Sequence, residues 1–369
     1  AERGLLFLKS EDGSSDLEMG RGSEGADLPE VSSYSTTIIR RVRETKKPIV
    51  VTGTAEGEVL GSASIAAHGL RSIIAAPVMM GTRVLGVIYL DSRLAKGIFT
   101  ENHLDLLVAI GFQIGIAFET SRSARIEVEK ADLEKDLALT GAMQQFFLPR
   151  VNSFSRQGVQ VESYYQPAQH CGGDWWWVEP SEDAGTNVIL GDVTGHGAAS
   201  AMMTAAVSSR YETVLGEPAA RLKSLSDLLA SRTNGRYMMT MTFLRFDPGA
   251  AKFAWWSAAA PPLLLRRASG KTDLVTTVGT PLGSAEYTFG FKEEPFLAKE
   301  RMFIFTDGLS ELNVGGGKQL GMRRLKKIFD ETCALPLAAA RDEIGKRLDA
   351  ERGKTPLADD VTFVLVERD

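Results

Sequence analysis

The stretch Leu190-Gly-Asp192-Val-Thr-Gly-His196-Gly-Ala198 places an aspartate just beyond a hydrophobic run, ahead of a glycine turn and an alanine-rich helix. Three other stretches also set an aspartate at a strand end or in a turn: Cys171-Gly-Gly-Asp174, Phe303-Ile-Phe-Thr-Asp307 and Ala358-Asp359-Asp360-Val-Thr. A strand that ends in a turn presents its last side chain at the rim of a sheet, so we expect these carboxylates to converge. Because carboxylates held together repel one another, the pattern predicts that cations lie between them.

The kind of cation follows from the ligand atoms. Every candidate ligand is an oxygen and no His/Cys cluster lies nearby, which favours Mg²⁺ or Mn²⁺ over zinc. Two such ions bridged by carboxylates lower the pKa of a water and hold a phosphate oxygen, an arrangement that hydrolyses phosphoesters. A single aspartate after a strand is more often a turn or helix cap, so the prediction rests on four matched contexts. His196 either donates a proton to the leaving group or caps a turn.

Composition and charge limit the class of protein. The chain has 369 residues, of which 44% are hydrophobic and 24% charged, as expected for a folded protein of about two domains. Its net charge of −5 gives no reason to expect a nucleic-acid surface. The two cysteines, Cys171 and Cys333, have no metal-type spacing and favour a reducing cytoplasm.

A membrane segment is not expected. The most apolar stretch, Leu106 to Phe118, is interrupted by Gln113 and is too short to cross a bilayer, and no signal peptide is evident. The chain begins Ala1-Glu-Arg-Gly without a methionine, which is typical of a fragment of something longer.

The first 120 residues alternate strand-like and glycine- or serine-rich segments. Residues 73–80 and 84–90 predict two strands of a hairpin joined at Gly81-Thr-Arg83. A helix is predicted from Thr100, where Thr-Glu-Asn-His is a plausible cap, to about Phe147.

The stretch from Arg122 to Asp136 is rich in charged residues, with a sparse apolar stripe at Ile126, Leu133 and Leu137. Such a helix between two domains indicates a connecting segment that pairs with a second copy of the chain as a coiled coil. A single solvated helix packed on its own domain is the alternative, because Lys130 and other polar residues break the heptad. Both interpretations stay open.

After Pro149 the chain is β-rich with inserted helices, which predicts an α+β sandwich. The strand candidates are residues 159–165, 187–190, 240–246, 251–256, 263–267, 301–305 and 360–367. The helix candidates are residues 198–214, 217–231 and 337–351.

The ordered motifs closely resemble the SpoIIE/RsbU-type branch of the metal-dependent PPM, or PP2C-like, serine/threonine phosphatases. Besides the four aspartate motifs, Met143-Gln-Gln-x-x-Leu148-Pro149 and Gly279-Thr-Pro-Leu-Gly283 look like that branch. The resemblance covers residues from about 130 to 369 and implies a β-sandwich flanked by helices.

The resemblance also implies roles for single residues. Asp174 and Asp192 would bridge two Mn²⁺ or Mg²⁺ ions with help from the carbonyl of Val193. Asp307 and Asp359 would complete the second site. Animal relatives place their proposed acid histidine elsewhere, which weakens the case for His196 as the acid.

Two positions depart from the family pattern. Many members carry an acidic residue where Trp177 stands, and many have a Gly-His pair near Ser257-Ala-Ala-Ala260-Pro-Pro. Trp175, Trp176 and Trp177 either fill a core, the favoured interpretation, or form a substrate platform.

Residues 1 to about 120 resemble a GAF domain, with a first strand near Leu5-Leu-Phe-Leu8 and later strands at Ala76-Pro-Val and Leu85-Gly-Val-Ile-Tyr-Leu90. The resemblance implies an α/β sensor fold with or without a small ligand. The helix that usually precedes the first strand is not found. Residues 1–120 contain no cysteine, which argues against a bilin pigment.

These observations predict a GAF-like sensor domain over residues 1–120, a helical linker over residues 121–149 and a phosphatase domain over residues 150–369. The predicted activity is hydrolysis of phosphoserine or phosphothreonine on a partner protein, which by resemblance would be a STAS-type anti-sigma-factor antagonist. We expect a cytoplasmic signalling enzyme, a homodimer, that contacts neither nucleic acid nor membrane. A catalytically silent phosphatase-fold module that docks a partner is the alternative, whereas a GGDEF-type cyclase is set aside because Trp-Trp follows Gly-Gly-Asp174.

Overall fold

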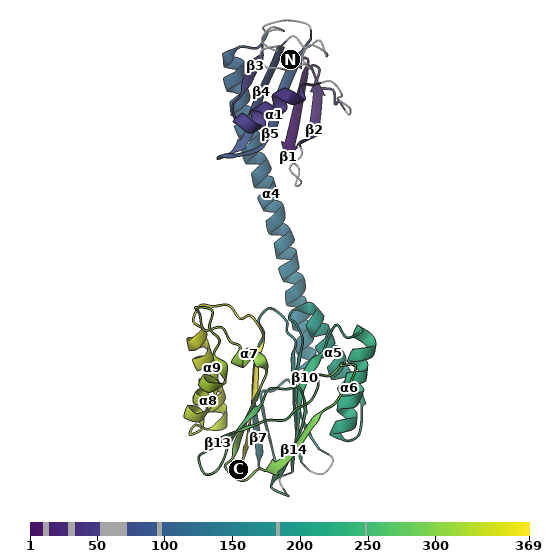
Figure 1. Ribbon diagram of the computed structural model, residues 1–369, viewed down its shortest axis with the longest axis vertical. Helices are drawn as coiled ribbons and strands as arrows, with labels where there is room; N and C mark the ends of the chain where they lie inside the picture. The colour runs from purple at the N-terminus through teal and green to yellow at the C-terminus, as the bar shows by residue number, and fades with distance from the viewer. Residues whose placement is uncertain (10–14, 29–33, 52–71, 94–97, 182–184, 248) are drawn as a thin grey trace. The chain divides into compact units, whose positions relative to one another are not determined.

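A computed structural model describes residues 1–9, 15–28, 34–51, 72–93, 98–181, 185–247 and 249–369. These residues form two compact units, Ala1–Ala131 and Asp132–Asp369 (Figure 1). Each unit has its own hydrophobic core. The predicted linker, residues 121–149, spans the division between the units.

The N-terminal unit is built on an antiparallel sheet in the order β2-β1-β5-β4-β3. Its strands are β1 (Arg3–Lys9), β2 (Ser15–Gly22), β3 (Ile49–Val51), β4 (Ser72–Met80) and β5 (Arg83–Ser92). The predicted hairpin is confirmed as β4 and β5, which turn at Gly81-Thr82. One face packs on the amphipathic helix α1 (Thr36–Thr45), whose buried side chains are Ile38, Ile39 and Val42.

Helix α4 (Glu101–Gln144) covers the other face, where Leu107 packs with Ile74 and Ala76. A side chain at Gly115 would lie 2.1 Å from the carbonyl oxygen of Met79, so only glycine permits this close approach. The predicted cap is present, because the backbone N–H of Thr100 donates to Nδ1 of His103 at 3.1 Å.

Helix α4 also differs from the sequence-based expectation about membranes. By length and composition alone, Glu101–Phe147 is sufficient to cross a bilayer, with a mean hydropathy of 1.4 in a window that is 17% buried. One such helix is weak evidence, since helices of soluble proteins meet the same criterion. The absence of membrane contact therefore stays a prediction.

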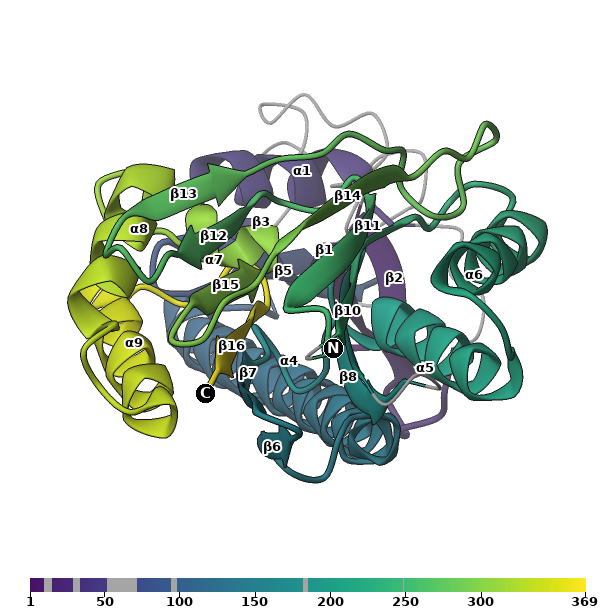
Figure 2. The same ribbon diagram turned by 90° about the horizontal axis from the view of Figure 1, so that it is seen from below.

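The C-terminal unit contains two antiparallel sheets packed face to face. The order β14-β11-β10-β9-β8 forms one sheet and β13-β12-β15-β16-β7-β6 the other. Helices α5 (Ala198–Thr213) and α6 (Pro218–Thr233) lie on one side of this sandwich, and α8 (Gly321–Thr332) and α9 (Leu337–Arg352) lie on the other (Figure 2). This arrangement is the α+β sandwich flanked by helices that the sequence predicts.

The bounds of the strands agree with the pattern of buried side chains. The first sheet contains β8 (Asp174–Pro180), β9 (Thr186–Val193), β10 (Met239–Asp247), β11 (Lys252–Ala258) and β14 (Gly290–Pro295). The second contains β6 (Ser153–Arg156), β7 (Val159–Gln166), β12 (Leu263–Arg266), β13 (Thr272–Val275), β15 (Arg301–Phe305) and β16 (Val361–Arg368). Buried Met239 and Met241 belong to the hydrophobic core of this unit, so the methionine-rich segment is packing.

Sequence reasoning missed several elements. The sequence pattern does not predict strand β8, because three consecutive tryptophans hide its alternation. Helix α8 was also missed, although Leu325, Ile328, Phe329 and Thr332 follow helical spacing on its buried face. Its charged residues between these positions conceal the stripe.

Candidate metal centre

Strands β8 and β9 bring the first two predicted ligands together. Asp174 begins β8, Asp192 stands one residue before the end of β9, and the register of the antiparallel pair sets them directly opposite each other. Side chains at directly opposite positions lie about 4.5–5.5 Å apart at their Cβ atoms. Asp174 is 1% exposed and Asp192 is partly buried.

Residues of the second sheet hold the carboxylate of Asp174. The hydroxyl of Thr306, the residue just after β15, donates to Oδ2 of Asp174 at 3.0 Å. The hydroxyl of Thr362, in β16, donates to the same oxygen. The carboxylate therefore lies where the two sheets meet, and its orientation is fixed by both.

The other two predicted ligands come from the second sheet. Asp307 follows β15 and begins the short helix α7 (Asp307–Ser310), and Asp359 precedes β16. The carboxyl groups of Asp192 and Asp307 are close enough to hydrogen bond. Asp174, Asp192, Asp307 and Asp359 thus converge, as the sequence predicts, from four separate strand ends.

The proximity of these carboxylates changes their protonation. Burial, and then repulsion from Asp174, Asp307 and Asp359, raises the pKa of Asp192 to about 10. Burial and the charge of Asp360 likewise raise the pKa of Asp174. Burial raises the pKa of Asp359, with smaller contributions from Asp360 and Asp307. The cluster needs protons or cations to be stable at neutral pH.

The donor set fits hard divalent cations, because it consists of carboxylate oxygens that repel one another. In the parts of the chain that the structure describes, no three His, Cys, Asp or Glu side chains form a ready-made metal site. The fit therefore rests on the chemistry of the donors and on their mutual repulsion.

Asp360 has a different role from its neighbour Asp359. It is 2% exposed, and its carboxylate accepts the backbone N–H groups of Ala168 at 2.8 Å and Gly173 at 2.6 Å. It holds the Gly172-Gly173 turn that leads into Asp174. The sequence analysis assigns no such role to Asp360. The signal for it is the alternation of a strand: adjacent residues entering a strand face opposite sides, so only one of Asp359 and Asp360 can face the cluster.

Gln144, the last residue of α4, supports the same turn. Its Nε2 donates to the carbonyl oxygen of Gly172 at 2.7 Å and to the hydroxyl of Thr204 at 3.0 Å. Its Oε1 accepts the backbone N–H of Gly172 at 3.0 Å. The sequence singled out this glutamine only as part of a motif, since nothing local predicts its distant partners.

Val193 and His196 lie on the segment that leaves β9. The backbone N–H of Val193 donates to the carbonyl of Gly173 at 3.1 Å. A side chain at Gly173 would lie 2.5 Å from the carbonyl oxygen of Val193, so glycine is required there. His196 is exposed, with Nδ1 3.3 Å from Nε2 of Gln169, and its charge opposes the rise in the pKa of Asp359 and Asp360. His196 therefore lies beside the cluster.

The tryptophans fill the core. Trp175 is fully buried and Trp176 is 3% exposed, while Trp177 stacks on Trp175 with 6.4 Å between ring centroids. The favoured core interpretation is confirmed, and Trp177 supplies no ligand atom. Ala259, in the segment without the Gly-His pair, has φ of 52° in the left-handed region that favours glycine.

Comparison with known proteins agrees with this architecture. The family model of stage II sporulation protein E (SpoIIE) matches residues 182–369, just over half of the chain, and the GAF domain model matches residues 1–118. The phosphoserine phosphatase RsbP of Bacillus subtilis is 22% identical over 248 residues, which are 64% of this chain and 59% of RsbP. The chain thus spans less than two thirds of that relative.

Two solved structures are similar in fold. The SiaA-PP2C domain of Pseudomonas aeruginosa matches with a TM-score of 0.58 and 20% identity, covering 66% of this chain and 98% of that domain. The RsbU and RsbW domains of Rv1364c from Mycobacterium tuberculosis match with a TM-score of 0.50 and 22% identity, covering 59% of this chain and 62% of that one. The C-terminal unit therefore has the PP2C fold, and the chain, with a GAF domain at its N-terminal end, belongs to the SpoIIE family.

Proposed function

We propose that the chain is a metal-dependent protein serine/threonine phosphatase. The observation that carries this proposal is the convergence of Asp174, Asp192, Asp307 and Asp359 at the meeting point of two sheets, with the pKa of Asp192 raised to about 10. Membership of the SpoIIE family supports the same activity.

In this proposal Asp174 and Asp192, together with the carbonyl of Val193, would hold two Mn²⁺ or Mg²⁺ ions, and Asp307 and Asp359 would complete the second site. The chemistry that such ions would supply is activation of a water as nucleophile and neutralisation of charge on the phosphoryl group. The hydroxyls of Thr306 and Thr362 orient Asp174.

Other residues serve the reaction less directly. Asp360 and Gln144 keep the Gly172-Gly173 turn in place. His196, exposed beside the carboxylates, is proposed to give a proton to the departing seryl oxygen. The support for this role is its location beside Asp359 and Asp360.

The proposed substrate is a partner protein phosphorylated on serine or threonine, and the proposed partner is an anti-sigma-factor antagonist of the STAS type. The match to a protein named as a phosphoserine phosphatase supports the first part. The resemblance to the RsbU-type branch motivates the second.

The proposed regulator is the GAF domain, acting with or without a small ligand through α4. Many apolar side chains of α4 are exposed, including Leu106 at 61% and Leu133 at 60%. A homodimer paired along this helix in the cytoplasm would cover them. Gln144 would transmit a change in helix pairing to the Gly172-Gly173 turn, since it hydrogen bonds to Gly172.

Hydrolysis of p-nitrophenyl phosphate with and without Mn²⁺ tests the activity. We expect manganese-dependent turnover that disappears in Asp192→Ala and persists in Asp227→Ala, a control on the exposed face of α6 whose side chain is 65% exposed. Full turnover in Asp192→Ala would refute the assigned site. Absence of turnover in the native chain, while a phosphorylated partner is still bound, would favour the silent docking module.

A further inference from the structure

A cavity of about 480 Å³ adjoins the acidic cluster. Its lining includes Asp359, Gly308, which is the neighbour of Asp307, and also Glu311 and Lys318. A volume in this range holds a whole small ligand, so it has room for side chains next to a phosphorylated residue. The cavity is therefore placed to receive the peptide that flanks a phosphoserine bound at the proposed metal site.

A closed hairpin forms the wall that carries Lys318. Asn313 and Gln319 pair across it, and the backbone N–H of Val314 donates to the carbonyl of Lys318 at 3.0 Å. The three glycines at 315–317 turn the chain with φ of 89°, 62° and 70°, a conformation that favours glycine. The backbone at Lys318 is thus held by hydrogen bonds.

Buried leucines anchor both ends of the hairpin. Leu312 is 5% exposed and Leu320 is 3% exposed, and the backbone N–H of Leu320 donates to the carbonyl of Leu312 at 2.9 Å. The hairpin therefore presents Lys318 from a fixed base.

The charges around the cavity are unequal. Lys318 is exposed, and in the described ranges no hydrogen bond or ion pair from another residue occupies its ammonium group. The other titratable lining residues described are the acids Glu311 and Asp359, and Glu311 accepts from Nε2 of Gln319 at 3.4 Å. Asp359 belongs to the proposed metal site, where a bound cation would compensate its charge, so Lys318 is the lining group that would pair with an anionic part of the ligand.

We propose that the 313–319 hairpin is a specificity element, in which Lys318 binds the carboxylate of an acidic residue close to the phosphorylated residue of the substrate. This inference rests on the proposed phosphatase function and names its substrate class, an acidic phosphopeptide segment. Lys318 selects the sequence around the phosphate, while the metal ions that the aspartates would hold act on the phosphate itself.

Two phosphoserine peptides that differ only in Glu or Gln beside the phosphorylated residue test the proposal. An exposed charge pair is worth a modest amount, so we expect the native enzyme to prefer the acidic peptide in kcat/KM by about fivefold. Lys318→Gln should abolish the preference and Lys318→Glu should reverse it. Lys346→Glu, the same charge change at an exposed site on α9 that does not line the cavity, should keep it.

Three kinetic outcomes would overturn the proposal: equal use of both peptides by the native enzyme, a preference that survives Lys318→Glu, and an equal loss for both peptides in that variant. The last outcome would place the ammonium group on the phosphoryl group that both peptides share.

Peptide binding measured by fluorescence anisotropy separates this inference from the phosphatase proposal. If the native chain binds the acidic peptide more tightly, Lys318→Glu loses this preference and neither peptide is hydrolysed, the subsite is supported and the phosphatase activity is refuted. Hydrolysis without any preference in rate or binding would keep the activity and refute the subsite.

Discussion

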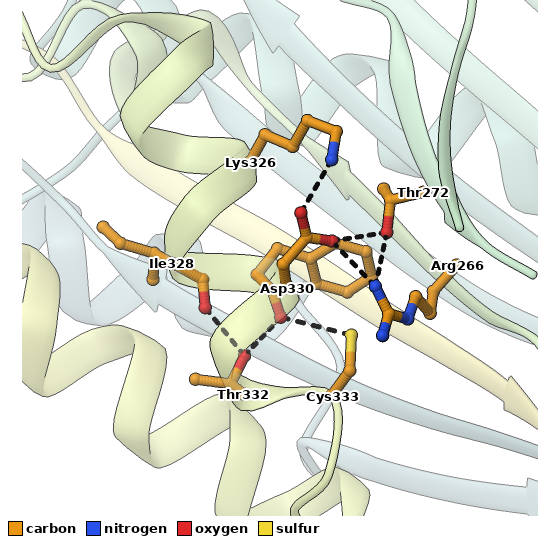
Figure 3. A network of polar contacts seen from close by, with 8 residues as sticks. Arg266, Thr272, Lys326, Ile328, Asp330, Thr332 and Cys333 are labelled. Atoms are coloured by element: carbon orange, nitrogen blue, oxygen red, sulfur yellow. Dashed lines mark hydrogen bonds and ion pairs between the residues drawn. The ribbon is translucent and has the colours of Figure 1, made fainter. Parts of the chain in front are cut away.

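Two groups of polar side chains in the C-terminal unit each surround a partly buried aspartate, with opposite consequences. Asp330 on α8 accepts from Lys326 at 2.7 Å and from Thr272, and it pairs with Arg266 at 3.4 Å (Figure 3). Although burial acts to raise the pKa of Asp330, hydrogen bonds from Lys326 and Thr272 and the charge of Arg266 lower it. Asp192 has carboxylates around it instead, and its pKa rises to about 10.

The difference separates a structural carboxylate from a candidate functional one. Asp330 has cationic and hydroxyl partners within the protein, so its charge is compensated and joins α8 to β12 and β13. The cluster around Asp192 places like charges together at a cost in stability, unless a cation or a proton compensates them. Strongly perturbed carboxyls without a cationic partner therefore mark the candidate site.

The largest expected effect comes from Asp174→Asn, which removes one charge from the cluster and keeps the shape of the side chain. We expect turnover of p-nitrophenyl phosphate to fall more than about 100-fold, beyond the 10–100-fold typical of residues that only support a ligand. The metal-free chain should resist urea better, because repulsion is relieved. A variant that keeps turnover and loses stability would make Asp174 a structural residue like Asp330.

Asp360→Asn tests the residue that holds the Gly172-Gly173 turn. Its amide nitrogen cannot accept the N–H of Gly173 or Ala168, so the turn loses a partner. We expect Mn²⁺ affinity, measured by isothermal titration calorimetry, to weaken by about 10–100-fold. Asp227→Asn is the matched control on α6, and equal affinity in both variants would contradict the supporting role.

The pH dependence of metal binding distinguishes the two groups further. Because the folded pKa of Asp192 is about 10, protons compete with Mn²⁺ throughout the neutral range. We expect affinity to rise about tenfold per pH unit between about pH 6 and 8 for each proton displaced. Calorimetry in buffers of different ionisation enthalpy counts the protons, and release of none would contradict the raised pKa.

Without metal, the two aspartates affect stability in opposite pH windows. The folded pKa of Asp192 lies above its unfolded value of about 4, so its contribution is full below about pH 4 and is lost as pH rises toward 10. The folded pKa of Asp330 is lowered, so its contribution is present above about pH 4 and is lost on acidification.

Asp330→Asn should therefore lower the free energy of unfolding by about 1 kcal/mol at pH 7, since the network is partly exposed. When the pH is lowered from 8 to 3, the free energy of unfolding measured in urea should fall less in this variant than in the native chain. Phosphatase turnover should stay at the native level, and a large loss of turnover would remove the contrast between the two groups.

The smallest expected effect belongs to Thr362→Val, which deletes one of the two hydroxyl donors to Asp174 and keeps the buried volume. One hydrogen bond is worth about 0.5–1 kcal/mol, so Mn²⁺ affinity should fall about two- to fivefold. Titration of this variant beside Thr213→Val, an exposed site at the end of α5, measures the difference. Equal Mn²⁺ affinity in the two variants would indicate that Thr306 alone orients Asp174.

The sequence by itself singled out the four aspartates that the structure brings together and predicted most of the strands that carry them, and it also predicts the kind of cation that suits carboxylate ligands. These features are local: a hydrophobic run, a glycine turn and an acid at the strand end can be read within a few residues. The hairpin of β4 and β5 and the helix from Thr100 follow from the same kind of local pattern.

The tertiary structure decided which residues support the aspartates. Thr306 and Thr362 reach Asp174 from more than 130 residues away, and Gln144 reaches Gly172 across 28 positions. No local spacing encodes such contacts, because they depend on how two sheets and a helix end pack together. The same packing placed Asp360 behind the Gly172-Gly173 turn and the tryptophans in the core. Only the side of the strand that each residue faces distinguishes Asp360 from Asp359.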